Sequence, residues 1–133
     1  MILGQPVFDA NVPLERLYGR KLSVWMVQLE AMSAAIGDPL YGFRVYPIGP
    51  LLRVMARPGR SNRYDFDPEV AVRLHWMGVP AVKVNAAVKY VNAEDGGISH
   101  FHYLRDNVRF IGLHLKLMVE APIYWVQMLF RRN

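Results

Sequence analysis

Two stretches of the chain carry apolar residues at the three- and four-residue spacing of an amphipathic helix. The first begins at Leu14 and continues to Ile36, where Gly37 is expected to end it. Its apolar residues predict one buried face, made of Leu17, Tyr18, Leu22, Trp25, Leu29, Met32 and Ile36. A helix of roughly 20 residues is about 30 Å long, which is the width of a small domain. This helix is therefore expected to form a main wall of the core.

The second stretch has two apolar rows, so its apolar face is wide. One row is Leu104, Val108, Ile111, Leu115, Met118, Trp125 and Leu129, and the other is Phe110, Leu113, Leu117, Tyr124 and Met128. Lys116, Glu120 and Pro122 interrupt this pattern, and the final apolar run is about half the roughly 20 residues that cross a bilayer. Two interpretations stay open. The helix lies in a membrane interface with its terminal arginines near anionic head groups, or it packs on its own domain or on a second copy.

Strand patterns alternate with these helices. Ile2 to Phe8 predicts a short strand, and Pro6 indicates an edge or a bulge in it. The apolar residues from Val82 to Tyr90 alternate with polar and small ones, which predicts a strand with one apolar face. Two shorter helices are expected to begin near Pro50 and Pro68. Together these elements predict an α/β fold with few strands and long amphipathic helices, including an apolar C-terminal helix.

Composition limits the class of protein. The length of 133 residues allows one domain, and a hydrophobic content of 53% excludes a disordered chain. The net charge of +5 suits anionic partners. Nucleic acid is disfavoured, because the basic residues are scattered and the aromatic residues follow core spacing. The lack of cysteine and the absence of a signal-peptide pattern at the N-terminus predict a cytoplasmic location.

The residues 38–47 concentrate chemistry in a short stretch. Asp38 precedes a proline, and Gly42 leads into a Phe-Arg-Val-Tyr strand pattern, so a turn delivers one carboxylate and Arg44 to a strand edge. Arg16, Arg20 and Lys21 crowd the start of the first long helix, where the helix dipole disfavours cations. These cations form either a phosphate-binding cluster at the helix N-terminus or a solvated basic face.

Two further segments have alternative interpretations. The loop with Arg57, Arg60 and Arg63 could clamp a phosphate, or it is an exposed basic loop. Asp65 and Asp67 could share a divalent cation. No apolar strand precedes this pair, however, and Asp67-Pro68-Glu69 has the N-cap, first-position proline and early acid of a helix start. The sequence therefore favours helix capping by Asp67, with Val70, Ala71, Leu74 and Met77 forming a short apolar face that ends at Gly78.

The order of short motifs along the chain carries a resemblance. The motifs are Gly4-Gln5-Pro6-Val7-Phe8-Asp9, Arg16 with Gly19-Arg20, Asp38 with Gly42-Phe43-Arg44-Val45-Tyr46, Phe66-Asp67-Pro68-Glu69, Gly78-Val79-Pro80, Val88-Lys89-Tyr90, Gly97-Ile98-Ser99-His100-Phe101 and Arg105-Asp106-Asn107. In this order they resemble the C-terminal half of bacterial family-2 glycosyltransferases. The likeness covers nearly the whole chain, and it looks closest to the branch that contains polyprenyl-phosphate sugar transferases.

The resemblance implies a partial nucleotide-sugar transferase (GT-A-like) fold. In that family the N-terminal half supplies the donor site and a metal-binding Asp-x-Asp, and Met1 falls where the later strands should begin. The chain is therefore expected to be a fragment, with residues 1–98 as the acceptor-side part and residues 99–133 as a C-terminal amphipathic helical segment. A divalent cation, Mg²⁺ or Mn²⁺, is implied for the intact enzyme, with its ligands mostly outside this chain.

The resemblance also implies roles for particular residues. Asp38 matches a carboxylate near the acceptor and would act as base or acceptor orienter, and Arg44 could hold a phosphate bidentately. Glu69 would orient the acceptor side, and His100 would lie near the diphosphate. The predicted site thus comprises Asp38 and Glu69 as catalytic residues, with Arg16, Arg20, Arg44 and His100 binding substrate or phosphate. The alternative for these residues is a structural role. Asp38 would then form a turn, Arg44 a buried ion pair, Glu69 a helix cap and His100 a hydrogen bond at the end of a strand.

Two functions are compatible with these patterns. The first is the acceptor-side portion of a glycosyltransferase that moves a sugar from a nucleotide-sugar donor to a lipid-linked or phosphorylated acceptor, on the inner face of the cell membrane. This portion would be inactive alone. The second is a non-catalytic basic α/β module that binds anionic membranes or a partner protein. In either case two copies could pair through the last helix.

Overall fold

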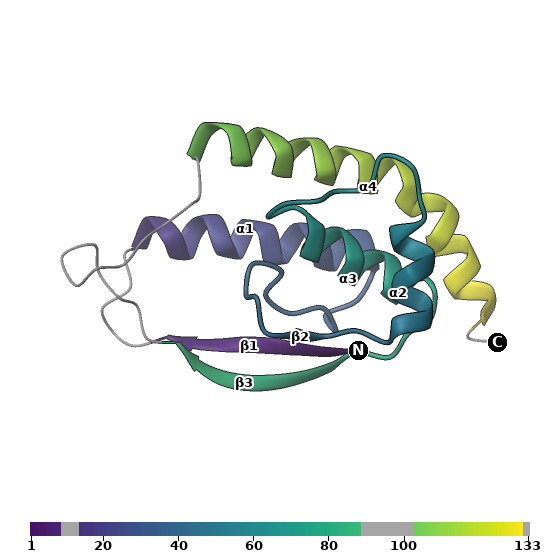
Figure 1. Ribbon diagram of the computed structural model, residues 1–133, viewed down its shortest axis with the longest axis horizontal. Coiled ribbons are helices and arrows are strands. Elements are labelled where there is room, and N and C mark those ends of the chain that lie inside the picture. Colours follow the sequence, from purple (N-terminus) through teal and green to yellow (C-terminus); the bar gives the residue numbers. More distant parts are fainter. Residues whose placement is uncertain (9–13, 89–102, 132–133) are drawn as a thin grey trace.

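A computed structural model describes residues 1–8, 14–88 and 103–131 of the chain (Figure 1). The elements, in chain order, are β1 (Ile2–Phe8), α1 (Leu14–Ala31), β2 (Arg44–Val45), α2 (Ile48–Met55), α3 (Phe66–Trp76), β3 (Val82–Val88) and α4 (Tyr103–Arg131). The predicted mixed α/β class is confirmed. In the described ranges it consists of a three-stranded sheet and four helices.

The sheet has the strand order β2-β1-β3. Strands β1 and β3 are parallel over their whole length, from Ile2 opposite Val82 to Phe8 opposite Val88. The antiparallel partner β2 reaches only the first two residues of β1, and the Gly4 amide donates to the Phe43 carbonyl at 2.8 Å just beyond them. β1 is thus the central strand, and Pro6 lies opposite Ala86 of β3, so the prediction of an edge strand is wrong. Alternate amides point to the same side of a strand, so the nitrogen of Pro6 faces the side on which β2 has already ended, and proline is tolerated there.

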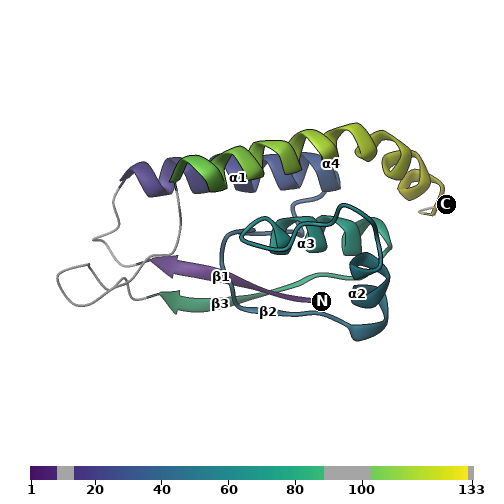
Figure 2. The same cartoon turned by 45° about the horizontal axis from the view of Figure 1, so that its top comes forward.

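Helices cover one face of the sheet in two layers. Figure 2 shows α3 between the sheet and an outer layer in which α1 and α4 lie side by side. The core joins all of these layers and includes Leu3, Val27, Ile36, Ala71, Val72, Trp76, Leu113 and Leu117. Almost every residue of α3 is buried, from Pro68 to Leu74 and again at Trp76. The sequence predicted burial of a single apolar face of this helix, whereas α3 is buried on nearly all sides.

Helix α1 ends five residues earlier than predicted. Met32 adopts a left-handed conformation with φ of 47°. The amides of Met32 and Ser33 donate to the carbonyls of Leu29 and Gln28, both at 3.0 Å. These two bonds form a Schellman motif with methionine in the position that glycine usually occupies. The chain then turns back toward the sheet, and Ile36 reaches the core from this turn rather than from the helix.

The apolar face predicted to be buried on α1 instead faces outward. Tyr18, Leu22, Trp25, Leu29 and Met32 are all exposed, with Trp25 at 60%. The core side of the helix is formed by Val27, Glu30 and Ala31. The prediction of an amphipathic helix is correct, but the apolar side that the period identifies is the outer one.

On α4 one apolar row enters the core and the other stays outside. Phe110, Leu113 and Leu117 are buried, whereas an outer row is exposed along the whole helix, made of Leu104, Val108, Ile111, Leu115, Val119, Ile123, Val126, Leu129 and Phe130. The helix runs through Lys116, Glu120 and Pro122 without a break, and its axis turns toward α2 near the C-terminal end (Figures 1 and 2). No helix in the described ranges has the length and apolar content needed to span a membrane.

The start of α3 differs from the predicted capping pattern. The N-cap residue is Asp65 rather than Asp67, and its side chain makes no capping hydrogen bond. Asp67 lies inside the first turn, together with Glu69. The carboxylate of Asp67 instead accepts a hydrogen bond from the Tyr46 hydroxyl at 2.9 Å. A tertiary contact has thus taken the side chain that local sequence assigned to the cap.

Candidate functional site

Asp38 is the centre of the first polar cluster. Its side chain is 6% exposed, and both carboxylate oxygens are engaged. Oδ1 accepts the Leu40 amide at 2.8 Å, which closes an Asx turn. Oδ2 accepts Nη1 of Arg20 at 2.6 Å, and Arg20 keeps 19% of its side chain exposed. The proline after Asp38 fixes this turn beneath α1, so the helix and the turn meet through one charge-assisted hydrogen bond.

Arg44 approaches the same turn from β2. Its Nη2 donates to the Asp38 carbonyl at 2.8 Å, and its Nε lies 3.8 Å from Oδ1 of Asp67. The side chain is 3% exposed, and neither Nε nor Nη1 has a hydrogen-bond partner among the described residues. Two buried donors of a cationic group are costly to leave without an acceptor. We name Arg20, Asp38 and Arg44 the Asp38 cluster.

Tyr46 and Asp67 border the Asp38 cluster. Burial raises the pKa of the Tyr46 hydroxyl; the Arg44 charge opposes this rise, whereas the carboxylate of Asp67 adds to it. The hydroxyl therefore stays protonated and serves as a hydrogen-bond donor to Asp67. The sequence did not single out Tyr46 or Asp67 as site residues. The Tyr46 hydroxyl is 21 residues from its acceptor, so no local pattern could have indicated this contact.

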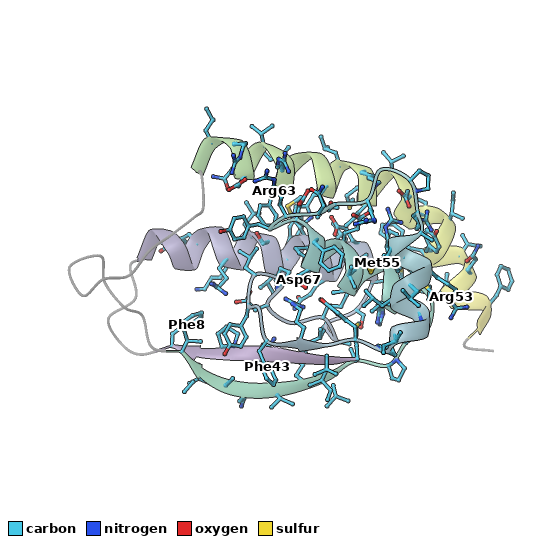
Figure 3. All side chains as sticks on the ribbon, in the orientation of Figure 1. Phe8, Phe43, Arg53, Met55, Arg63 and Asp67 are labelled. Atoms are coloured by element: carbon cyan, nitrogen blue, oxygen red, sulfur yellow. The ribbon has the colours of Figure 1, made fainter. Side chains whose placement is uncertain are left out.

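Arg20 of the Asp38 cluster reaches the carboxyl end of the parallel strands, whereas Arg44 lies opposite Leu3, near the amino end of β1. The guanidinium carbon of Arg20 is 5.1 Å from the centroid of the Phe8 ring, and Phe8 is the last residue of β1. Figure 3 shows Phe8 pointing from this strand toward the helices. In open α/β sheets ligands bind at the carboxyl ends of the strands. The position of Arg20 therefore suits a binding site.

Glu69 belongs to a different cluster, which links α3 to α4. Its Oε1 accepts Nε of Arg73 at 2.8 Å and Nζ of Lys116 at 3.0 Å, and its Oε2 accepts the Ser61 amide at 2.6 Å. Arg73 also binds Glu120 through both terminal nitrogens, at 2.6 and 2.9 Å. We name Glu69, Arg73, Lys116 and Glu120 the Glu69 cluster. It is a closed network in which Arg73 joins two carboxylates.

Hydrogen bonding sets the ionisation of the Glu69 cluster. Burial raises the pKa of the Glu69 carboxyl, but hydrogen bonds from the Ser61 amide, Arg73 and Lys116 outweigh this effect and lower it to about 2. Hydrogen bonding to Arg73 likewise lowers the pKa of Glu120. A carboxylate this acidic is a weak general base near neutral pH. The chemistry of Glu69 therefore favours ion pairing over proton transfer.

A third polar pair is buried in the core. Nδ1 of His114 lies 2.7 Å from Oε1 of Glu30, and both side chains are at most 4% exposed. Burial raises the pKa of the Glu30 carboxyl, and the hydrogen bond and charge of His114 oppose this rise. The backbone carbonyl of Glu30 also accepts the indole N–H groups of Trp76 and Trp125, at 2.9 and 2.8 Å. This pair ties α1, α3 and α4 together.

The structure thus brings three of the predicted site residues together, Arg20, Asp38 and Arg44. Glu69 has its described contacts in a separate cluster. The side chain of Arg16 and the whole of His100 lie outside the described residues. Within the described ranges, no group of three or more His, Asp or Glu side chains is arranged to hold a metal ion. A divalent cation thus stays a prediction from the resemblance.

Arg73 and Glu120 were not identified from the sequence. The four-residue spacing from Glu69 to Arg73 is typical of an ion pair on one helix face, so this pair was accessible to sequence reasoning. Glu120 is 47 residues from Arg73, and only the packing of α4 on α3 brings them together.

Comparison with protein-family models, with curated proteins and with solved structures finds no match for this chain.

Proposed function

We propose that this chain is the acceptor-side part of a family-2 glycosyltransferase with a GT-A-like fold, and that the Asp38 cluster holds the phosphate of a lipid-linked or phosphorylated acceptor. One observation carries the proposal. Arg20 and Arg44 converge on the Asp38 turn, and the Arg20 guanidinium also lies against Phe8, the last residue of β1. The ordered sequence motifs supply the rest of the support, because they include Gly19-Arg20, Asp38 and the Gly-Phe-Arg turn.

Each member of the Asp38 cluster has its own task in this proposal. Arg20 is partly exposed, so its guanidinium can turn from Asp38 to an incoming phosphate oxygen while keeping one hydrogen bond to the carboxylate. Arg44 supplies two buried donors, Nε and Nη1, that make no hydrogen bond to a described residue, although Nε lies 3.8 Å from Oδ1 of Asp67. Asp38 orients both arginines, through its carboxylate and its carbonyl. Glu69 contributes to the acceptor side by fixing α3 against α4.

The reaction class follows from the acceptor. A phosphate oxygen of the acceptor attacks the anomeric carbon of the sugar, the bond from that carbon to the donor diphosphate breaks, and the nucleoside diphosphate departs. An acceptor phosphate that is already ionised needs no general base, so Asp38 can act as a positioning residue rather than a proton acceptor. The donor site and the divalent cation belong to the half of the enzyme that, by resemblance, precedes this chain.

Calorimetry with two ligands tests the acceptor site. Farnesyl phosphate, a short polyprenyl phosphate, is expected to bind the chain saturably, and a panel of nucleotide sugars is expected not to bind. Arg20→Gln should weaken farnesyl phosphate binding by about tenfold, the value of one charge-assisted hydrogen bond. Arg63→Gln, which removes an exposed loop charge, should leave it unchanged. Equal binding by the two variants, or binding of a nucleotide sugar, would contradict the proposal.

The DNA upstream of Met1 offers an independent test. An in-frame segment that encodes an apolar strand followed by Asp-x-Asp would supply the donor half, and expression of that longer chain should give sugar transfer to a polyprenyl phosphate. An unrelated gene immediately upstream would count against a transferase.

A second function is favoured by a specific observation, the exposed apolar surface of the outer helices. The outer row of α4 lies beside Arg105 and Arg109, which are exposed on the same helix. An apolar row flanked by cations is typical of a helix that lies on an anionic membrane. We therefore propose as the alternative a non-catalytic module that binds membranes through α1 and α4.

A further inference from the structure

A cavity of about 200 Å³ lies between α2, α3 and α4, away from the Asp38 cluster. Three of the residues that line it are arginines, Arg53, Arg57 and Arg73. No aspartate or glutamate lines it. Arg53 lies on α2 at the end of the molecule opposite Phe8 (Figure 3). We name this space the arginine cavity. Cations gathered in one concave space raise the local concentration of anions.

The three arginines of the arginine cavity differ in how far their donors are used. Arg73 is buried, and all three of its side-chain nitrogens donate to carboxylates of the Glu69 cluster. Arg57 donates from Nη1 to the Tyr124 hydroxyl at 3.1 Å and from Nη2 to Glu120 at 3.3 Å. Arg53 makes no hydrogen bond or ion pair with any described residue. The charges of Arg57 and Arg73 are thus paired with Glu120 and Glu69, and Arg53 supplies the guanidinium that no described group neutralises.

Two aromatic and two aliphatic side chains, Trp76, Tyr124, Val54 and Met77, form the remaining wall. The rings of Trp76 and Tyr124 are stacked, with centroids 4.3 Å apart and planes 8° from parallel. The Tyr124 hydroxyl accepts from Arg57 and keeps its own proton to donate to a ligand. The stack is held in place because the Trp76 indole N–H is bound to the Glu30 carbonyl. The donors that face the cavity are thus presented by a rigid support.

We propose that the arginine cavity binds a phosphomonoester group or free phosphate. Guanidinium groups match the oxygens of phosphate in bidentate geometry, and Arg53 and Arg57 can approach a phosphate from two sides. A volume of about 200 Å³ corresponds to roughly seven waters of the liquid, which accommodates a phosphate with a small organic substituent. Neither the Asp38 cluster nor the proposed acceptor takes part in this site.

The test uses inorganic phosphate and the full chain at low salt. Calorimetry should show saturable binding that weakens about tenfold in Arg53→Gln and in Arg57→Gln, since each substitution removes a charge-assisted contact. Arg60→Gln is the matched control, because Arg60 is exposed in the same loop as Arg57 but does not line the cavity. It should bind as the parent chain does, and circular dichroism should show that all three variants are folded.

Two further arms identify the source of the phosphate and separate the two sites. In the first, vesicles of neutral lipid with phosphatidic acid replace inorganic phosphate. If the chain binds these vesicles but not inorganic phosphate, and Arg53→Gln weakens that binding, the ligand is a lipid head group. The Arg53→Gln effect should persist in an Arg20→Gln background, in which phosphate binding at the Asp38 cluster is weakened. The proposal is overturned if neither probe binds in an Arg53-dependent way, or if Arg60→Gln weakens binding as much as Arg53→Gln does.

Discussion

Two glutamates, Glu30 and Glu69, are equally inaccessible, yet the structure shifts their acidities in opposite directions. Their side chains are 0% and 3% exposed. Glu69 accepts three hydrogen bonds, two of them from cations, whereas Oε2 of Glu30 has no partner among the described residues. Burial dominates at Glu30 and raises its pKa, while hydrogen bonding outweighs burial at Glu69. The number of donors around a buried carboxylate therefore decides whether its charge stabilises the fold.

The first prediction compares Glu69→Gln with Glu30→Gln. Glu69→Gln should lower the free energy of unfolding by about 3 kcal/mol, because it breaks a buried ion pair and leaves Arg73 with Glu120 alone. Glu30→Gln should change it by less than about 1 kcal/mol, since a neutral amide still meets His114 and no charge is buried. Urea denaturation at neutral pH measures both values. Equal losses in the two variants would show that burial alone governs these sites.

The second prediction concerns pH. The pKa of Glu69 is about 2 in the folded chain and about 4.5 when unfolded, so the unfolded state takes up its proton first as the pH falls. Its contribution, about 3 kcal/mol, is present above about pH 4.5 and is lost as the pH falls through about 2. Glu30 has the opposite sign. Its raised pKa makes the folded state bind the proton more tightly, so its contribution is lost as the pH rises above 4.5.

Denaturation of the parent chain and the two variants, from about pH 2 to about pH 7, checks these signs. Glu69→Gln should flatten the acid limb of the curve, and Glu30→Gln should flatten the decline at higher pH. An acid limb that is unchanged in Glu69→Gln would contradict the assignment.

At the residue scale the sequence was informative where partners are close along the chain. It placed Asp38 in a turn, and that turn is closed by the Leu40 amide two residues away. It placed Glu69 in the first turn of a helix, where it is found. It could not find Tyr46 as the partner of Asp67 or Glu120 as the partner of Arg73, because those contacts depend on how separate elements pack.

At the scale of elements, replacing two glycines by alanine is expected to change stability in opposite directions. Gly19 lies inside α1 with no atom within 4 Å of the place a Cβ would take. Gly4 lies in β1, where a Cβ would meet the Tyr41 ring at 2.6 Å and the Phe43 Cβ at 3.0 Å. The third prediction is that Gly19→Ala stabilises the chain by about 0.5–1 kcal/mol, because alanine is the better helix former.

Gly4→Ala should instead destabilise the chain by about 1–3 kcal/mol, because the turn that carries Asp38 must move away from β1. Thermal unfolding compares the two variants, and Gly112→Ala, which also has open space in a helix, is expected to follow Gly19→Ala. A loss of stability in Gly19→Ala would mean that the exposed side of α1 is packed against something.

The elements themselves were mostly predictable. The bounds of β1 are as predicted, and α1, α2, α3 and α4 lie near their expected places. The buried side of α1 was not predictable. Its apolar residues lie on more than one side of the helix, and their spacing does not tell which side packs on the core. The early end of α1 was also hidden. Residues other than glycine rarely adopt the left-handed backbone conformation that Met32 has, and nothing in the local sequence predicts it there.

At the scale of the whole molecule, the outer helices α1 and α4 present exposed apolar side chains along their length. The outer row of α4 includes Leu104 and Val119, each 79% exposed, and Trp25 is exposed on neighbouring α1. Extended apolar patches mark interaction surfaces. The α/β class was predictable from alternating strand and helix patterns, but the central place of α3 and the open outer layer were not, since both depend on how the layers stack.

The fourth prediction tests this outer surface. The double variant Leu115→Ser/Val119→Ser should weaken binding to anionic vesicles by about tenfold, because each side chain loses part of its transfer free energy. Gln127→Ser, at an exposed polar position of the same helix, is the matched control. Co-sedimentation with vesicles measures binding, and added salt should weaken it in all chains. Loss of a dimer in the double variant, with no vesicle binding by the parent chain, would favour pairing through α4 instead.

The central claim is that Arg20 and Arg44 hold the phosphate of the acceptor, and nuclear magnetic resonance of the arginine Nε–H groups tests it most directly. In a ¹⁵N-labelled chain titrated with farnesyl phosphate, the Nε–H signals of Arg20 and Arg44 should shift saturably, while that of the exposed Arg63 should not move. Shifts confined to arginines outside the Asp38 cluster, or no saturable shift at all, would contradict the account.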